Sequence, residues 1–115
     1  MNNNLKVVAD YHTHTIYSDG KGTIEQNVKS AIDKGIEIIG ISDHGYKHMG
    51  FGVKYNLFEK MRYEIDLIKE KYPQIKILLG VECNILDDRG NIDIDDKILG
   101  YFDYVMAGYH FGSMP

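Results

Sequence analysis

The chain has 115 residues, 43% of them apolar, with 13 lysines and arginines against 17 aspartates and glutamates, which fits one domain with a buried core. The formal charge of -4, without a basic stripe, argues against a nucleic-acid or anionic-membrane partner. The apolar runs contain neither a signal peptide nor a membrane span, so we expect a cytoplasmic protein.

Four short segments rich in Val, Ile and Leu are predicted to be strands buried on both faces. In chain order they are Leu5 to His14, Ile36 to His44, Lys76 to Asn84 and Asp103 to His110. Helical patterns separate them, and this alternation is typical of parallel strands joined by right-handed crossovers. A complete (β/α) barrel takes about 250 residues. We therefore expect an α/β fold that forms the N-terminal half of such a barrel.

The first helix is expected to begin at Thr23, which forms a capping box with Gln26 three residues later. Gly35 closes the helix. Its apolar face is made of Ile24, Val28, Ala31 and Ile32.

The second helix is also predicted to begin with a capping box, in which Asn56 is the N-cap and Glu59 its partner. Pro73 is expected to end this helix. Its apolar positions are Phe58, Met61, Ile65, Ile68 and Tyr72. The acidic stretch from Asp87 to Asp96 lacks the spacing of a calcium loop and is expected to be a turn. A short third helix follows it, from about Asp95 to Tyr101.

Each predicted strand finishes with a residue that can bind a metal ion. His12 and His14 project from one face of the first strand, because residues two apart share a face. The next three strands end in His44, Glu82 and His110. In α/β folds the carboxyl ends of parallel strands are where sites lie. We therefore predict a metal site built from all four strands.

The only cysteine is Cys83, so neither a disulfide framework nor a thiolate zinc cluster is available. Nitrogen and oxygen ligands of this kind suit Zn²⁺, Mn²⁺ or Fe and do not choose among them. The carboxylate of Glu82 can bridge two ions, which would generate a hydroxide nucleophile and hold a phosphoryl group. Cys83 has no suitably placed base and is expected to be a buried strand residue.

Several residues near the strand ends are candidates for supporting roles. Glycines 40, 80 and 108 share a face with the ligand that ends their strand, and we expect them to leave space for ions and for side chains from opposite strands. Asp10 could orient a histidine ring from behind the ligands. Asp43 is expected to hydrogen-bond a loop.

The glycine-rich segment from Gly45 to Tyr55 follows the predicted ligand His44. Lys47 and His48 could contact a substrate phosphate from a mobile lid. Solvated loop charges are the commoner explanation for such residues, and we favour that explanation.

Four motifs together resemble the PHP superfamily, named for polymerase and histidinol phosphatase. They are DYHTHTIYSDG at Asp10, GISDHG at Gly40, GVECNI at Gly80 and MAGYH at Met106, in the family's order along nearly the whole chain. The resemblance is strongest to histidinol-phosphatase-like, stand-alone phosphoesterases. It implies a distorted (β/α)7 TIM-like barrel, of which residues 1–115 would form the N-terminal part.

The resemblance also implies a cluster of two or three metal ions at the carboxyl ends of the strands. It further implies hydrolysis of a small phosphorylated metabolite by a metal-activated hydroxide, with Glu82 and His110 at the catalytic centre. The implied ligands are His12 and His14 on the first ion, Glu82 as the bridge, His110 on the second ion, and Asp19 and His44 on the third.

The family takes further ligands from later strands, including a histidine and a final Asp-X-His, which residues 1–115 do not supply. We therefore expect residues 1–115 alone to bind metal weakly and to have little or no phosphatase activity. An uncovered barrel edge also predicts association into homo-oligomers.

Three alternatives stay open. An amidohydrolase also begins with His-X-His on the first barrel strand, although the SDG and SDHG contexts favour the PHP interpretation. The chain could instead be a non-catalytic fragment that still binds metal. A PHP module serving a DNA polymerase is the third, and the acidic charge weighs against it.

Overall fold

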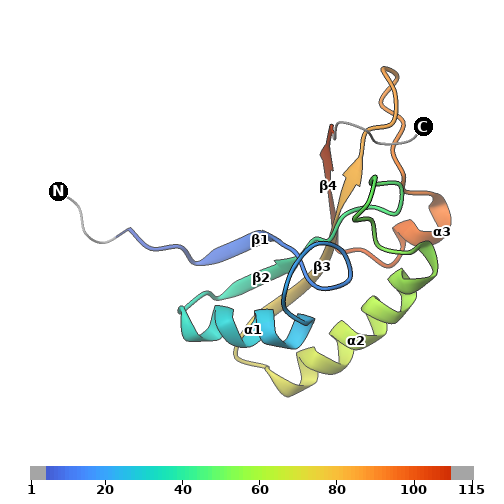
Figure 1. Cartoon of the computed structure of the whole chain (residues 1–115). Helices are drawn as coiled ribbons and strands as arrows, with labels where there is room; N and C mark the ends of the chain where they lie inside the picture. The colour runs from blue at the N-terminus through green and yellow to red at the C-terminus, as the bar shows by residue number, and fades with distance from the viewer. Residues whose placement is uncertain (1–4, 110–115) are drawn as a thin grey trace.

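The computed structural model describes residues 5–109. Its four strands form a parallel sheet in the order β1-β2-β3-β4. The strands are β1 (Ala9–Thr13), β2 (Ile38–Ile41), β3 (Lys76–Asn84) and β4 (Tyr104–Gly108). The helical elements are α1 (Ile24–Asp33), the 3-10 turn η1 (Tyr55–Leu57), α2 (Phe58–Lys71) and α3 (Asp96–Leu99). The sheet curls from β1 to β4, and α1 and α2 lie along the same face of it (Figure 1). The predicted α/β half barrel is therefore confirmed.

The core lies between this face of the sheet and the two longer helices. The helices contribute Ile24, Val28 and Ala31 from α1 and Phe58, Met61, Ile65 and Ile68 from α2. The strands contribute Ile39, Ile41, Ile77, Leu79 and Val81 from β2 and β3. Removal of this apolar surface from water holds the two central strands in place. Within the described residues, no helix is both long and apolar enough to cross a membrane.

The outer strands differ from the prediction that every strand is buried on both faces. In β1, Tyr11 is 46% exposed, and in β4, Val105 is 38% exposed. Among residues 5–109, each of these strands pairs with a single neighbour, so its other edge has no partner strand in this part of the chain. The first strand is also shorter than expected, because it begins at Ala9 while Leu5 is exposed.

The first helix forms as its sequence predicts. Thr23 is its N-cap and accepts a hydrogen bond from the Gln26 N–H, while the Gln26 side chain accepts one from the Thr23 N–H. Gly35, with a φ of 75°, follows the C-cap Lys34 and allows the left-handed turn that ends the helix.

The predicted cap of the second helix is wrong. Leu57, not Asn56, is the N-cap of α2, and no side chain caps this end. The reason is the 3-10 turn η1, in which the Leu57 N–H donates to the Lys54 carbonyl and leads straight into the helix. The third helix is confirmed in a shorter form, with Asp95 as its N-cap.

Tyr104 of β4 reaches across the sheet as far as β1. Its hydroxyl donates to the main-chain oxygen of Tyr11, and the two rings meet edge to face at 5.9 Å. A Cβ atom at Gly40 or Gly80 would overlap the Tyr104 side chain. Gly40 and Gly80 therefore leave space for a side chain from another strand, as expected, and Tyr104 rather than an ion fills that space. Burial raises the pKa of Tyr104 to about 12, so its hydroxyl stays a donor.

Candidate metal centre

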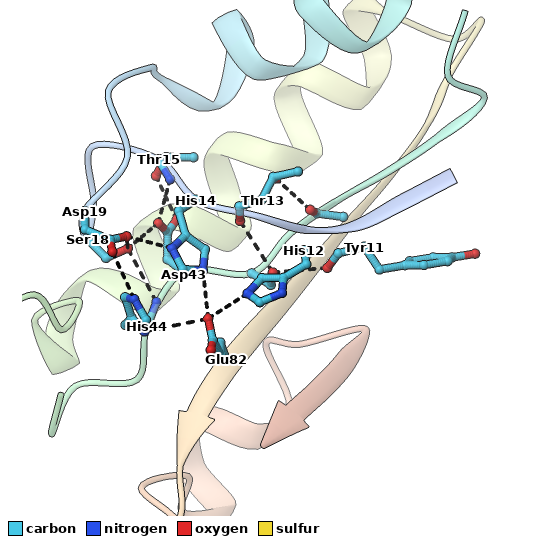
Figure 2. A network of polar contacts seen from close by, with 12 residues as sticks. Tyr11, His12, Thr13, His14, Thr15, Ser18, Asp19, Asp43, His44 and Glu82 are labelled. Atoms are coloured by element: carbon cyan, nitrogen blue, oxygen red, sulfur yellow. Dashed lines mark hydrogen bonds and ion pairs between the residues drawn. The ribbon is translucent and has the colours of Figure 1, made fainter. Parts of the chain in front are cut away.

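His12 of β1 and His14, just after its end, face a carboxylate from β3. Nε2 of His12 lies 2.8 Å from Oε1 of Glu82, and Nε2 of His14 lies 2.9 Å from the same oxygen. β1 directs both rings to one side because the residues are two apart. Figure 2 shows the two rings converging on Glu82.

The parallel register brings His44 to the same place. Beyond the end of β2, His44 forms an isolated parallel bridge with Glu82. Its ring nitrogen Nδ1 lies 3.7 Å from Oε1 of Glu82, and its Nε2 lies 3.1 Å from Oδ2 of Asp19. Asp19 also contacts His14, with 2.6 Å between its Oδ1 and the ring Nδ1. The loop after β1 therefore closes a second side of the cluster.

These side chains form two groups whose ligand atoms lie within 4.8 Å of one another, namely His12, His14 and Glu82, and His14, Asp19 and His44. His14 belongs to both groups, with each of its ring nitrogens facing a carboxylate. A neutral imidazole has one N–H and can donate to only one of them. Either a doubly protonated ring or a cation beside it satisfies both carboxylates, so the donor set fits metal ions.

The protonation states in the second group favour cation binding. Burial lowers the pKa of His44, whose side chain is 7% exposed, and the nearby His48 lowers it further. Burial raises the pKa of Asp19, but the hydrogen bond from His14 and the charges of both histidine rings lower it overall. A neutral imidazole and an ionised carboxylate are the forms that ligate metals.

Asp43 holds the loop that carries Asp19. This buried carboxylate accepts hydrogen bonds from the Thr15 N–H at 2.6 Å, the Thr15 hydroxyl at 2.7 Å and the Ser18 hydroxyl at 2.6 Å. Burial raises the pKa of Asp43, while these hydrogen bonds oppose the rise. The predicted loop-binding role of Asp43 is confirmed. Gly20 completes the turn, since a Cβ atom there would overlap the His14 carbonyl.

Asp10 lies outside this cluster of side chains. Asp10 accepts a hydrogen bond from the main-chain N–H of His12 at 3.1 Å, so it meets the strand rather than an imidazole. His110 lies outside the described residues, and its role as a ligand stays a prediction.

The two candidate substrate contacts lie in different surroundings. The ammonium group of Lys47 lies over the ring of Tyr46, 5.8 Å from its centroid. The ring of His48 stacks on that of His44, with 4.0 Å between centroids and 29° between planes. His48 is therefore brought to the cluster, whereas the Lys47 side chain contacts the loop itself.

The sequence patterns do not identify Asp93 as a residue that supports the site. It is 2% exposed and accepts hydrogen bonds from the Asn84 N–H at 2.7 Å, the Asn84 side-chain amide at 2.5 Å and the Lys47 N–H at 3.1 Å. It lies in the acid-rich stretch from Asp87 to Asp96, for which the sequence predicts a turn. The antiparallel bridge between Ile85 and Ile92 places residue 93 opposite residue 84, so hairpin register is the signal that would have found it.

Comparison with known proteins agrees with the motifs. The family model of the PHP domain matches residues 10–115. A probable phosphatase from Caldanaerobacter subterraneus is 40% identical over 107 residues, which cover 92% of this chain and 40% of that protein. The DNA polymerase/3'-5' exonuclease PolX of Bacillus subtilis is 33% identical over 106 residues, which cover 91% of this chain and 18% of that protein.

A solved structure matches as well. The histidinol phosphate phosphatase of Lactococcus lactis, complexed with zinc, L-histidinol and phosphate, superposes with a TM-score of 0.64 and 27% identity. The match covers 89% of this chain and 40% of that one, so this chain spans about 40% of the length of the phosphatases it matches. These similarities favour the PHP interpretation over the amidohydrolase alternative. The chain therefore belongs to the PHP domain family.

Proposed function

We propose that the chain provides the first part of a metal-dependent phosphoesterase site of the histidinol-phosphatase type. One observation carries the proposal: a single oxygen of Glu82 lies within 2.9 Å of a ring nitrogen of both His12 and His14. Strands β1 and β3, which are separated by β2, thus aim their donor atoms at one point. Two imidazoles and a carboxylate that converge in this way are suited to a divalent cation.

The proposed cations are Zn²⁺, Mn²⁺ or Fe, two or three of them in a complete site. His12, His14 and Glu82 would hold one, Asp19 and His44 would hold another, and His110 would join Glu82 on a further one. A bound divalent cation lowers the pKa of a water ligand and polarises phosphoryl oxygens, which is the chemistry that phosphomonoester hydrolysis needs.

The individual side chains of the site have separate proposed roles. The His12 side chain is 56% exposed, whereas those of His14, His44 and Glu82 are 18%, 7% and 14% exposed, so a substrate would approach from the side of His12. Asp43 fixes the loop that carries Asp19. Glu82 and His110 are the proposed catalytic residues, because they would contact the ions nearest the phosphate.

The proposed substrate is a small phosphorylated metabolite. Two similarities support it, namely the probable phosphatases among the relatives and the solved structure complexed with L-histidinol and phosphate. Because the chain spans about 40% of those proteins, we propose full activity for a whole barrel and little for residues 1–115 alone.

A panel of phosphomonoesters that includes histidinol phosphate tests this proposal. The chain, and a longer protein that contains it, would be assayed with Zn²⁺, Mn²⁺ or Fe²⁺. We expect phosphate release from the longer protein, its loss on chelation, and its loss in Glu82→Gln. A matched control is Glu59→Gln, which alters an exposed carboxylate on α2. Absence of bound metal and of hydrolysis in both proteins would contradict the proposal.

A second candidate is a module that acts on nucleic-acid phosphodiesters, which the similarity to PolX favours. The net charge of -4 weighs against it, since nucleic-acid sites are rich in lysine and arginine. Hydrolysis of a single-stranded oligonucleotide, with binding that weakens as salt rises, would select this candidate over the first.

A further inference from the structure

The loop that follows His44 returns to contact its ring. The main chain around His44 is fixed by β3, because the Glu82 N–H donates to the Asp43 carbonyl and the Gly45 N–H donates to the Glu82 carbonyl, both at 2.9 Å. The Val53 N–H donates to the His44 carbonyl at 3.1 Å and closes the far end of the loop. These bonds hold the backbone and leave the orientation of the ring to its side-chain neighbours.

His48 supplies a flat surface for that ring. The hydrogen bond from the His48 N–H to the Gly45 carbonyl, at 3.1 Å, folds the chain back so that the two imidazoles stack at 4.0 Å. His48 also meets the ring of Phe51, with 6.0 Å between the two centroids. Among the described residues, His48 belongs to neither group of ligand atoms. Within residues 5–109, His48 contacts this cluster through the face of the His44 ring.

Asp93 fixes the start of the loop. Its carboxylate accepts the Lys47 N–H and both the main-chain and side-chain N–H groups of Asn84, at the end of β3. The same carboxylate packs on Gly45 so closely that a Cβ atom there would overlap it. The buried Asp93 therefore ties the turn that places His48 to the strand that carries Glu82.

We infer that Asp93 and His48 are positioning residues for His44, and that they set the direction in which its Nε2 faces the cation site. The inference rests on the proposed function, in which His44 is a ligand. Asp93 holds the turn, the turn places His48, and the His48 ring limits rotation of His44 toward the loop. Residues that orient a metal ligand in this way commonly change metal affinity by roughly 10- to 100-fold when they are replaced.

Zinc titration of the full chain tests the inference with three variants. We expect His48→Ala and Asp93→Asn to weaken the site of Asp19 and His44 by roughly 10-fold or more, and to leave the site of His12 and Glu82 unchanged. His48→Phe keeps a flat ring and should bind as the natural chain does. Met49→Ala, an exposed position in the same loop, is the matched control.

Two results of the titration would overturn the inference. One is a zinc affinity of His48→Ala equal to that of the natural chain. The other is a loss in His48→Phe as large as that in His48→Ala, which would mean that a ring nitrogen of His48, and not its flat surface, is needed. Because Asp93 is buried, Asp93→Asn could unfold the chain, and the two His48 variants then decide.

A metal-free measurement separates this inference from the proposed function. In the ¹H–¹³C NMR spectrum of the histidine rings, the His44 signals should move in His48→Ala, because the ring current of the stacked neighbour is lost, and should stay close to their positions in Met49→Ala. If zinc does not bind but the His44 signals move, the proposed function fails and the stacking contact on which the inference rests stands. If zinc binds and the His44 signals do not move, the positioning role fails.

Discussion

Nε2 of His14 lies 2.9 Å from Oε1 of Glu82, although 68 residues separate them in the sequence. The other nitrogen of the same ring lies 2.6 Å from Oδ1 of Asp19. Within residues 5–109, His14 is the one residue that both groups of candidate ligands share. A substitution of His14 therefore removes a candidate ligand from both groups, whereas a substitution of His12 removes one from a single group.

His14→Ala should remove more bound metal than His12→Ala. His14→Ala takes a donor from both groups, whereas His12→Ala leaves the group of His14, Asp19 and His44 complete. Zinc bound per chain after equilibrium dialysis measures the difference. Equal zinc content in the two variants would contradict the assignment of His14 to both groups.

Gly80→Ala should destabilise the fold, because its new methyl group would overlap the Tyr104 ring. Overpacking of this kind typically costs about 1–3 kcal/mol. Gly100→Ala is the matched control, since nothing lies within 4 Å of a Cβ atom there and its φ of -66° suits alanine. We expect the control to change the free energy of unfolding in urea by less than about 0.5 kcal/mol. Similar losses in both variants would show that the contact with Tyr104 is not the cause.

Thr23→Ala should lower the free energy of unfolding by about 1 kcal/mol, the usual cost of losing an N-cap. Thr23 accepts the Gln26 N–H at the start of α1. Asn56→Ala is the informative comparison, because Asn56 is exposed and does not cap α2. Urea unfolding should show a change of less than about 0.5 kcal/mol for Asn56→Ala, and a loss equal to that of Thr23→Ala would restore the predicted second capping box.

Glu25→Gln should lower stability in a pH-dependent way. The hydrogen bond from Lys71, together with one from Tyr72, lowers the pKa of Glu25 below its ordinary 4.5. A carboxylate with a lowered pKa stabilises the fold above its ordinary pKa and loses that contribution as pH falls through its folded-state pKa. Urea midpoints of the two chains should therefore differ at neutral pH and converge below pH 4.5. A difference that is independent of pH would contradict the ionic origin.

Local signals in the sequence predicted much of the fold. β3 has the expected bounds, Lys76 to Asn84, because a buried central strand is a continuous apolar run. The cap of α1 was predicted because both partners, Thr23 and Gln26, lie within one turn. The cap at Asn56 was not real, since the same residue types also occur in a 3-10 turn.

The predicted strand-end residues within residues 5–109 come together, because parallel register aligns the carboxyl ends of neighbouring strands. The supporting contacts were harder to predict. Asp93 and Tyr104 act on residues far away in the sequence, through a hairpin register and a gap left by glycines. Neither residue type carries a local signal for such a contact, so Asp93 is found only through the register of the hairpin and Tyr104 only through the three-dimensional arrangement.

The most direct test of the metal centre is calorimetric titration of zinc into the chain and into Glu82→Gln. Glu82 contacts both His12 and His14 and lies beside His44. Its replacement by glutamine removes the negative charge of the group on which these rings converge and exchanges one carboxylate oxygen for an NH2 group. We predict saturable binding to the natural chain and a loss in Glu82→Gln greater than the roughly 10- to 100-fold typical of more distant supporting residues. Absence of binding to the natural chain, or equal binding to both chains, would contradict the account.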